Sequence, residues 1–291
     1  MIASKRVPAA NSRYVTVDDR RIHYLEAGID NDSNGPPVVL LHGSGIDDAA
    51  LSWKHTIEFV ADDLGRHVFA PDWPGYGKSD DPAASTTEYY VEVLTGVLDA
   101  LDLDRSALVG ISMGASVSLG YALDNSDRVS RLVLVDSYGL RDEVPGGTGS
   151  YLLANIPFAN LFGRQFAGAT VAGTRVAVGE FVHDPASLDD EFVAEVNERL
   201  RQPGAGKAFF SFMREEFQAD GVRTDYSDRL DDLGVPTLLV HGAEDPLVPV
   251  EWSATAAQSI PGARLMVIKR CGHWPSRERP DVFNDVLATF L

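Results

Sequence analysis

The sequence is poor in cysteine, in lysine and in long apolar runs. Its 291 residues include a single cysteine, Cys271, which excludes an intrachain disulfide and a cysteine-rich zinc site. No apolar run approaches the roughly 18 residues of a membrane-spanning helix, and the N-terminal stretch lacks the apolar core of a secretory signal. These absences lead us to expect a soluble, cytoplasmic protein without a membrane span.

Positive charge is scarce as well. The chain has 25 basic residues against 43 acidic ones, a formal net charge of −18, and five of the basic residues are lysines. A charge of this sign repels phosphate, so we expect no nucleic-acid partner. An acidic, lysine-poor surface also fits a high-salt habitat, although a codon bias with ordinary acidity would give the same composition.

Apolar strands and amphipathic helices alternate along most of the chain. A hairpin is predicted over 14–28, and buried strands are predicted at 37–43, 67–75, 106–112, 128–137, 236–245 and 263–270. Helical patterns lie between most of these strands, which favours a parallel sheet covered on both faces. The alternation stops for about ninety residues after the strand at 128–137. We therefore predict an α/β core of residues 1–139 and 231–291, with an insertion at 140–230.

The motif Gly110-Ile111-Ser112-Met113-Gly114 lies between a buried strand and a helix of small residues. A serine on so sharp a turn is held in strained backbone geometry, with its hydroxyl exposed near a helix N-terminus. The flanking glycines leave room for the neighbouring strand and helix. The motif therefore predicts a nucleophilic serine; the alternative is a helix start that is merely rich in glycine and serine.

A serine hydroxyl needs an oriented base before it becomes a good nucleophile. His273 follows the last predicted strand, where a loop can bring its imidazole to the carboxyl edge of the sheet. Asp245 ends the strand before it and is the candidate orienting acid. The chain order serine, acid, histidine is the order expected for this kind of sheet. Asp136, which ends its own strand, is the rival acid.

The segment His42-Gly43-Ser44-Gly45 follows a buried strand and supplies flexible backbone. The backbone N–H groups of Ser44 and Met113 are the predicted oxyanion hole, because amides aimed at a developing negative charge stabilise it. We interpret His42 as a residue that holds this loop. Cys271 precedes Gly-His at a strand end and is interpreted as buried packing.

Taken together, HGSG, PDWPGYGKSD, GISMG, HGAEDPLVP and CGHW resemble the α/β-hydrolase superfamily in order and spacing, over nearly the whole chain. The resemblance implies a mostly parallel sheet of about eight strands and a Ser-His-Asp hydrolase. It also implies a mainly helical cap inserted after the strand at 128–137, and neither a metal nor an organic cofactor.

Within the superfamily, HGSG paired with CGHW looks like the carbon–carbon bond hydrolases of ring-fission (meta-cleavage) products. Those enzymes usually have Asn before the nucleophile, Pro-Gly after HGSG and a cap arginine for the substrate carboxylate. Here Ile111 precedes the serine and Ile46-Asp47 follows HGSG. The sequence therefore favours a carboxylic-ester hydrolase, with carbon–carbon hydrolysis of a dienoate as the alternative. A ligand-binding protein on the same fold is the alternative of another class.

The front of the insertion, residues 144–179, contains no acidic residue. Its aromatic and aliphatic side chains either pack the insertion on the core or line a pocket for a small hydrophobic substrate. The predicted substrate-binding residues are Gly43, Phe158, Phe162, Arg164, Arg175 and Trp274. Acid-free stretches also cover 105–123 and 252–277, so the acidic surface is expected to stop at the active site. We expect a monomer or a homodimer.

Overall fold

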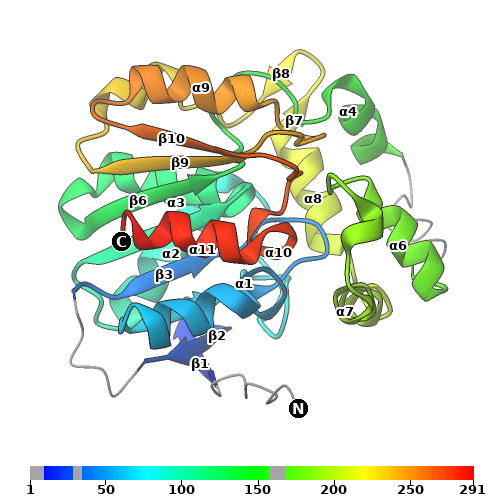
Figure 1. The fold of residues 1–291 in the computed structure, drawn as a ribbon, viewed down its shortest axis with the longest axis horizontal. Coiled ribbons are helices and arrows are strands. Elements are labelled where there is room, and N and C mark those ends of the chain that lie inside the picture. The colour runs from blue at the N-terminus through cyan, green and yellow to red at the C-terminus, as the bar shows by residue number, and fades with distance from the viewer. Residues whose placement is uncertain (1–9, 29–34, 157–167) are drawn as a thin grey trace.

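The computed structural model describes residues 10–28, 35–156 and 168–291. Among these residues, eight strands form one sheet in the order β1-β2-β4-β3-β5-β6-β9-β10 (Figure 1). Their bounds are β1 (Asn11–Val17), β2 (Arg20–Ala27), β3 (Val38–Leu41), β4 (Val68–Pro71), β5 (Ser106–Ile111), β6 (Val129–Val135), β9 (Thr237–Gly242) and β10 (Arg264–Ile268). The pairs β1–β2 and β2–β4 are antiparallel, and every other pair is parallel. The predicted mostly parallel sheet is thus confirmed.

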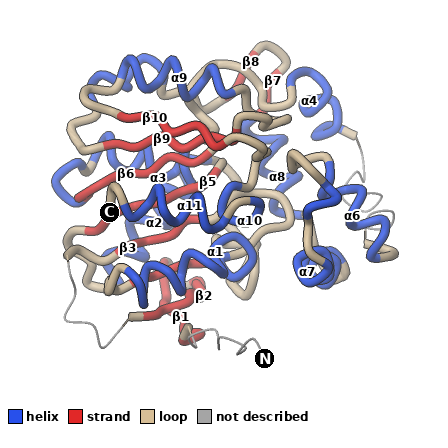
Figure 2. Tube along the Cα trace, in the orientation of Figure 1, coloured by secondary structure: helices blue, strands red, loops and turns tan. Residues whose placement is uncertain are grey.

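Helices cover both faces of this sheet (Figures 1 and 2). One face packs against α1 (Ala49–Glu58), which continues as a π-helical turn over Phe59–Asp63, and against α11 (Pro280–Ala288). The other face packs against α2 (Thr87–Ala100), α3 (Met113–Asp124) and α9 (Val250–Ser259). A short helix, α10 (Pro275–Glu278), precedes α11.

Strand β5 shows why the central strands read as continuous apolar runs. Leu108 packs with Tyr90 of α2, whereas its neighbour Val109 packs with Trp53 of α1. Consecutive side chains of a strand point to opposite faces, and here both faces are buried. The central strands therefore show no alternation of apolar and polar residues, because both of their faces are buried.

Between β6 and β9 the chain forms a further group of elements. Those within the described residues are α4 (Gly147–Asn155), α6 (Val171–Gly179), α7 (Asp190–Leu200), α8 (Lys207–Glu216), β7 (Phe217–Gln218) and β8 (Gly221–Val222). Short 3-10 turns lie in the same segment at Pro185–Ser187 and Ser227–Asp232, and another precedes β6 at Ser126–Arg128. In Figure 1, α6 and α7 lie beyond the strand ends, at the right. A small apolar cluster that includes Phe192 and Val196 of α7 joins this group to Leu51 of α1.

No helix within the described ranges combines the length and the apolar character that a membrane crossing requires.

Candidate active site

Ser112 occupies the turn between β5 and α3, as the motif predicts. Its backbone has φ 54° and ψ −116°, in a region that non-glycine residues rarely adopt. Its own carbonyl accepts hydrogen bonds from Ala115 N (3.1 Å) and Ser116 N (3.1 Å), which begin the helix. The hydroxyl thus stands at the N-terminus of α3, where the helix dipole favours negative charge.

Both glycines of the motif are required by close backbone approach. A Cβ on Gly110 would lie 2.3 Å from Gly114 O, and a Cβ on Gly114 would lie 2.3 Å from Leu41 O. The start of α3 therefore sits against the end of β3 at a distance that excludes any side chain. This contact brings the loop after β3 next to Ser112.

His273 and Asp245 meet as the sequence predicts. His273 Nδ1 lies 2.7 Å from Asp245 Oδ2, and the other oxygen of Asp245 accepts from Leu247 N (2.8 Å) and Val248 N (3.1 Å). Although burial raises the pKa of Asp245, His273 and these hydrogen bonds hold it below its usual value. Burial lowers the pKa of His273, but the Asp245 carboxylate and its hydrogen bond outweigh burial and raise it above 6.5.

The loop that carries His273 is held by Glu278 of α10, a residue that the sequence reasoning did not single out. Its carboxylate accepts from Gly272 N, Trp274 N and His183 N at 2.8–3.1 Å. A further bond, from His273 N to Phe181 O (2.8 Å), ties the same loop to the segment after α6. This role of Glu278 has no sequence signature, because one of its donors, His183 N, comes from a segment 95 residues away and the other two are backbone groups of the folded loop.

The loop after β3 is fixed by the buried Asp47. Its Oδ2 accepts from Gly43 N (2.9 Å) and from Ser52 Oγ (2.7 Å), whose oxygen accepts in turn from Trp274 Nε1 (2.9 Å). A Cβ on Gly43 would lie 3.4 Å from Ser112 Cβ, so this loop borders Ser112. Burial is the main reason that the pKa of Asp47 is raised, to about 6.

His42 has the structural role that the sequence suggested. Its Nδ1 bonds Gly43 O (2.7 Å) and its Nε2 accepts from Trp73 N (3.0 Å), with the ring fully buried. Cys271 is also buried, and burial raises the pKa of its thiol far above the usual range. Neither side chain is presented to a substrate.

A cavity of about 240 Å³ opens over Ser112 and His273. Most of its wall is apolar, and nine of the 19 described lining residues lie between β6 and β9, six of them in α6, α7 and α8. The described lining residues are Gly43, Ser44, Gly45, Ile46, Asp47, Ile111, Ser112, Ala177, Val178, Phe181, Val196, Leu200, Ala205, Gly206, Phe209, Phe210, Leu247, His273 and Trp274. Sequence reasoning missed Phe181, Phe209 and Phe210; the apolar run within 207–213 was the available signal.

Of the six predicted substrate-binding residues, two line the cavity, three lie outside the described residues, and Arg175 is engaged elsewhere. Gly43 and Trp274 line the cavity. Phe158, Phe162 and Arg164 lie outside the described residues.

Arg175 requires a correction, because it is absent from the described lining of the cavity. Its guanidinium instead bonds Pro185 O (3.1 Å), Leu188 O (2.8 Å) and Asp190 Oδ1 (2.6 Å). An arginine of α6 reaches the carbonyls of the next turn more readily than the cavity on the other side of the helix. Arg175 therefore fastens α6 to the start of α7.

Within the described ranges, one group of side chains has the spacing of a metal site: Asp136, His241 and Asp245. His241 Nε2 donates to Val248 O (2.9 Å), and its Nδ1 is bonded to Ser253 Oγ (2.7 Å). Both ring nitrogens are thus already engaged, which leaves the imidazole without a lone pair for a cation. These residues have the hydrogen bonding of a buried acid–imidazole cluster.

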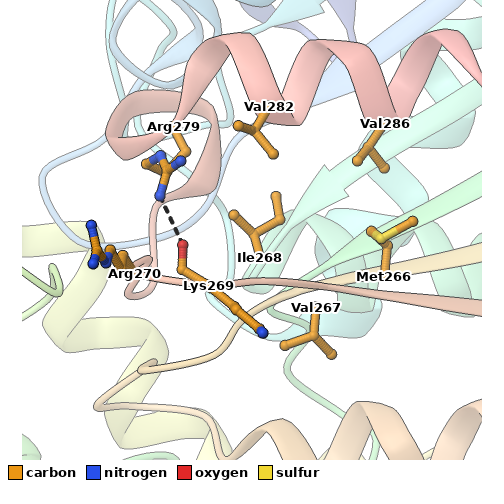
Figure 3. A pocket seen from close by; sticks show the side chains of 8 residues that line it. All are labelled: Met266, Val267, Ile268, Lys269, Arg270, Arg279, Val282 and Val286. Carbon is orange, nitrogen blue, oxygen red and sulfur yellow. Dashed lines mark hydrogen bonds between the residues drawn. The ribbon is translucent and has the colours of Figure 1, made fainter.

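A second, more open hollow of about 340 Å³ lies beside β10 and α11 (Figure 3). Its lining residues are Met266, Val267, Ile268, Lys269, Arg270, Arg279, Val282 and Val286. Arg279 closes one end by donating to Lys269 O (2.8 Å). The hollow shares no described lining residue with the first cavity, and its described lining contains no serine, cysteine, histidine or acid.

The fold and the arrangement of Ser112, His273 and Asp245 define a class of protein. The sequence profile of the alpha/beta hydrolase fold matches residues 36–280, and the chain belongs to this family. The resemblance drawn from the motifs is thereby confirmed, and the enzyme class that the family relationship supports is hydrolase.

Among its relatives is the 2-hydroxy-6-oxononadienedioate/2-hydroxy-6-oxononatrienedioate hydrolase of Cupriavidus pinatubonensis. It is 33% identical over 97% of this chain and 96% of its own length. The solved meta-cleavage product hydrolase of Pseudomonas fluorescens IP01 is 27% identical, with a TM-score of 0.78 over 96% of each chain. An esterase of Thermogutta terrifontis is 25% identical, with a TM-score of 0.76 over 97% of this chain and 98% of its own.

Proposed function

We propose that the protein is a serine hydrolase that cleaves the carbon–carbon bond beside the ketone of a ring-fission product of the 2-hydroxy-6-oxo-dienoate type. The observation that carries this proposal is the relationship, at 33% identity over 97% of the chain, to a hydrolase named for such a substrate. The esterase interpretation of the sequence thereby becomes the second candidate.

The chemistry assigns one role to each group of the site. Ser112 adds to the ketone carbon while His273 takes the hydroxyl proton, and Asp245 stabilises the imidazolium that results. The N–H groups of Ser44 and Met113 stabilise the oxyanion. The cleavage proceeds from the 2,6-dioxo tautomer of the substrate, in which C5 has gained the proton lost from the 2-hydroxyl group. When the tetrahedral intermediate collapses, the electrons of the C5–C6 bond are delocalised onto the 2-oxo group as a dienolate, which takes up a proton from the His273 imidazolium. Water then releases the acyl group from Ser112 as a carboxylic acid.

Residues 140–230 are proposed to act as a cap over this site. The helices α6, α7 and α8 supply six apolar residues to the cavity wall, which suits a small hydrophobic substrate and excludes water. The core of the enzyme would then consist of residues 1–139 and 231–291.

Two features favour the second candidate, hydrolysis of a neutral carboxylic ester. The cavity lining that the structure describes contains neither lysine nor arginine to pair with a substrate carboxylate. Ile111 also borders the cavity beside the nucleophile, where the carbon–carbon hydrolases usually have Asn. Both features suit an uncharged acyl group.

The two candidates are separated by comparing kcat/KM for a 2-hydroxy-6-oxo-6-phenyl-dienoate with values for p-nitrophenyl esters of increasing chain length. The first proposal expects kcat/KM for the dienoate to exceed that of the best ester by at least about 100-fold, since binding energy is best used on the true transition state. The reverse order would transfer the proposal to ester hydrolysis.

The nucleophile is tested by Ser112→Ala, which we expect to lower kcat by at least about 1,000-fold on either substrate. Ser116→Ala is the matched control: its Oγ is buried one turn further along α3 and has no described hydrogen-bond partner. It should retain activity within about twofold. Wild-type protein that neither turns over these substrates nor labels with a fluorophosphonate would instead be a binding protein.

A further inference from the structure

Two acidic side chains lie side by side at the carboxyl edge of the sheet. Strands β6 and β9 are parallel neighbours, with Val135 paired to Val240. Asp136 follows the first strand directly, and Asp245 follows the second after a short turn. Only Asp245 contacts His273, so the mechanism leaves Asp136 without a role.

Among the described residues, one carboxylate oxygen of Asp136 has a hydrogen-bond donor and the other has none. Its side chain is fully buried, and Oδ1 accepts from Gly242 N (2.8 Å). Oδ2 is also buried, yet it has no donor among the described residues. The nearest imidazole nitrogen, His241 Nε2, is 3.4 Å from Oδ1 and directs its proton to Val248 O. A buried acceptor without a donor is costly, so this oxygen requires an explanation.

A proton on Asp136 supplies that explanation. Two ionised carboxylates in one dry site repel each other, and one of them gains a proton. Asp245 has His273 and two backbone N–H groups to stabilise its charge, whereas Asp136 has one N–H. Burial and the neighbouring Asp245 carboxylate raise the pKa of Asp136 well above its usual value. A protonated Asp136 can donate its O–H towards the carboxylate of Asp245, which lies within 4.8 Å of it.

We propose that Asp136 is a positioning residue held as a neutral carboxylic acid, which hydrogen-bonds Asp245 and limits the proton affinity of His273. The inference rests on the Ser-His-Asp triad of the proposed function, and it holds for either substrate class. A hydrogen bond donated to Asp245 withdraws charge from the carboxylate that stabilises the imidazolium. His273 consequently releases its proton at a lower pH and can act as a base over a wider pH range.

Within the part of the chain that the structure describes, neither a lysine nor an arginine is among the groups that most affect Asp136. The titratable groups that face it come from β9, from the loops after β9 and β10, and from α10. They are His241, Asp245, Cys271, His273 and Glu278. Three of these are acids or a thiol, which favour the neutral form of Asp136.

Two substitutions test the proposal. Asp136→Asn replaces the acid by an amide whose Oδ1 can accept from Gly242 N while its Nδ2 donates to Asp245. Asp136→Gly removes the donor. Both suit the backbone, because Asp136 has φ 44°, a conformation that Asn and Gly tolerate better than other residues. A loss in either variant is then not caused by backbone strain.

The main readout is the pKa of His273, followed by 15N NMR of the imidazole and assigned by its loss in His273→Gln. The proposal expects Asp136→Asn to leave that pKa within about 0.3 units of the wild-type value and Asp136→Gly to raise it by roughly 0.5–1 unit. If Asp136 were ionised, both variants would lose a negative charge and lower the pKa of His273. That result, or no shift in the glycine variant, would overturn the proposal.

A second readout needs no variant and no substrate. The wild-type protein should show the infrared carbonyl band of a buried protonated carboxylic acid at mildly alkaline pH, and Asp136→Asn should lack it. An absent band in the wild type contradicts the proposal. Both readouts are independent of turnover, so a failure of the proposed function, seen as full activity in Ser112→Ala, is distinguishable from a failure of this inference.

Discussion

At the scale of single residues, the site depends on the balance between burial and charge around His273. Burial alone would keep the imidazole neutral, but the Asp245 carboxylate 2.7 Å away raises its pKa above 6.5. A base must be unprotonated to act, so activity is lost as pH falls through that raised value. The same ion pair that orients His273 therefore narrows the pH range in which it works.

The first prediction concerns this pH dependence. We expect log kcat/KM to fall with unit slope on the acid side, with a midpoint above pH 6.5, because a single proton on His273 blocks attack by Ser112. The measurement is kcat/KM across a buffer series of constant ionic strength. A midpoint below 6.5 would mean that burial outweighs Asp245 and that the assigned pair is wrong.

The second prediction concerns the effect of Asp47 on how the stability of the protein changes with pH. The folded protein holds a proton on Asp47 up to pH about 6, whereas the unfolded chain releases it near the usual 3.8. Stability therefore falls as pH rises between these two values, by about 3 kcal/mol for a shift of about two units. Asp47→Asn cannot ionise, so its stability relative to the wild type should rise by up to that amount between pH 4 and pH 7.

The measurement for Asp47 is urea unfolding of both proteins at several pH values. Comparing the change with pH removes any constant cost of replacing an acceptor oxygen by an amide. Asp63→Asn, which alters an exposed acid at the end of the π-helical turn, is the control for the loss of one negative charge. A stability difference for Asp47→Asn that stays flat across the window would show that Asp47 is ionised throughout.

At the scale of elements, charged pairs connect α7 of the proposed cap to α1 of the core. Arg199 Nη2 donates to Asp48 Oδ1 (3.0 Å), and Asp48 also accepts from Leu51 N (2.7 Å) as the N-cap of α1. Lys54 of α1 contacts Glu191 (2.6 Å) and Glu195 (2.8 Å) of α7. These pairs fix the position of a helix that lines the cavity.

The third prediction is that Arg199→Met destabilises the protein by about 1–3 kcal/mol and raises KM more than it lowers kcat. Methionine keeps the apolar contacts of the stem, but it leaves the carboxylate of Asp48, 12% exposed, without its cation. Urea unfolding and steady-state kinetics are the measurements. Lys207→Met is the control. Lys207 is 65% exposed and its partner Asp81 is 76% exposed, so their ion pair should contribute under about 0.5 kcal/mol to stability. Equal effects from both variants would contradict the prediction.

The elements of the core were largely predictable, and those of the proposed cap were less so. Buried strands such as β5 and β9 have apolar runs that end at the turns carrying Ser112 and Asp245, so pattern and motif agree there. Helix α7 has the spacing of apolar residues typical of an amphipathic helix, so it could be predicted from the sequence. Helix α8 and the β7–β8 hairpin could not, because the apolar face of α8 is divided between the core and the cavity, where Phe209 and Phe210 lie.

The residues of the candidate site were likewise predictable only in part. The proximity of Ser112, Asp245 and His273 could be predicted because each lies within a few residues of the carboxyl end of a parallel strand, and such ends share one edge of the sheet. Asp47 and Glu278 could not, because their function lies in hydrogen bonds to backbone groups of folded loops. The assignment of Arg175 was wrong for the same reason: composition places an arginine near a pocket but gives no direction to its side chain.

At the scale of the whole molecule, the net charge of −18 belongs to the exterior rather than to one patch. The acid-free stretches 105–123 and 252–277 contain β5, α3 and the His273 loop, which are mostly buried. The acids at the site are few and individually partnered, as Asp47, Asp136 and Asp245 show. The remaining acids outnumber the cations and repel one another across the surface, which disfavours the compact state.

Added salt should therefore stabilise this protein, which is the fourth prediction. Raising NaCl from about 0.05 M to about 0.5 M shortens the Debye length from about 14 Å to about 4 Å and screens repulsion between neighbouring acids. A gain of about 1–2 kcal/mol would raise Tm by roughly 2–4 °C for a chain of this size. Differential scanning calorimetry measures the change, and sucrose at matched osmolality separates screening from exclusion of the solute. A Tm that falls with NaCl would mean that attractive pairs such as Arg199–Asp48 dominate the surface, and that the acidity is no adaptation to salt.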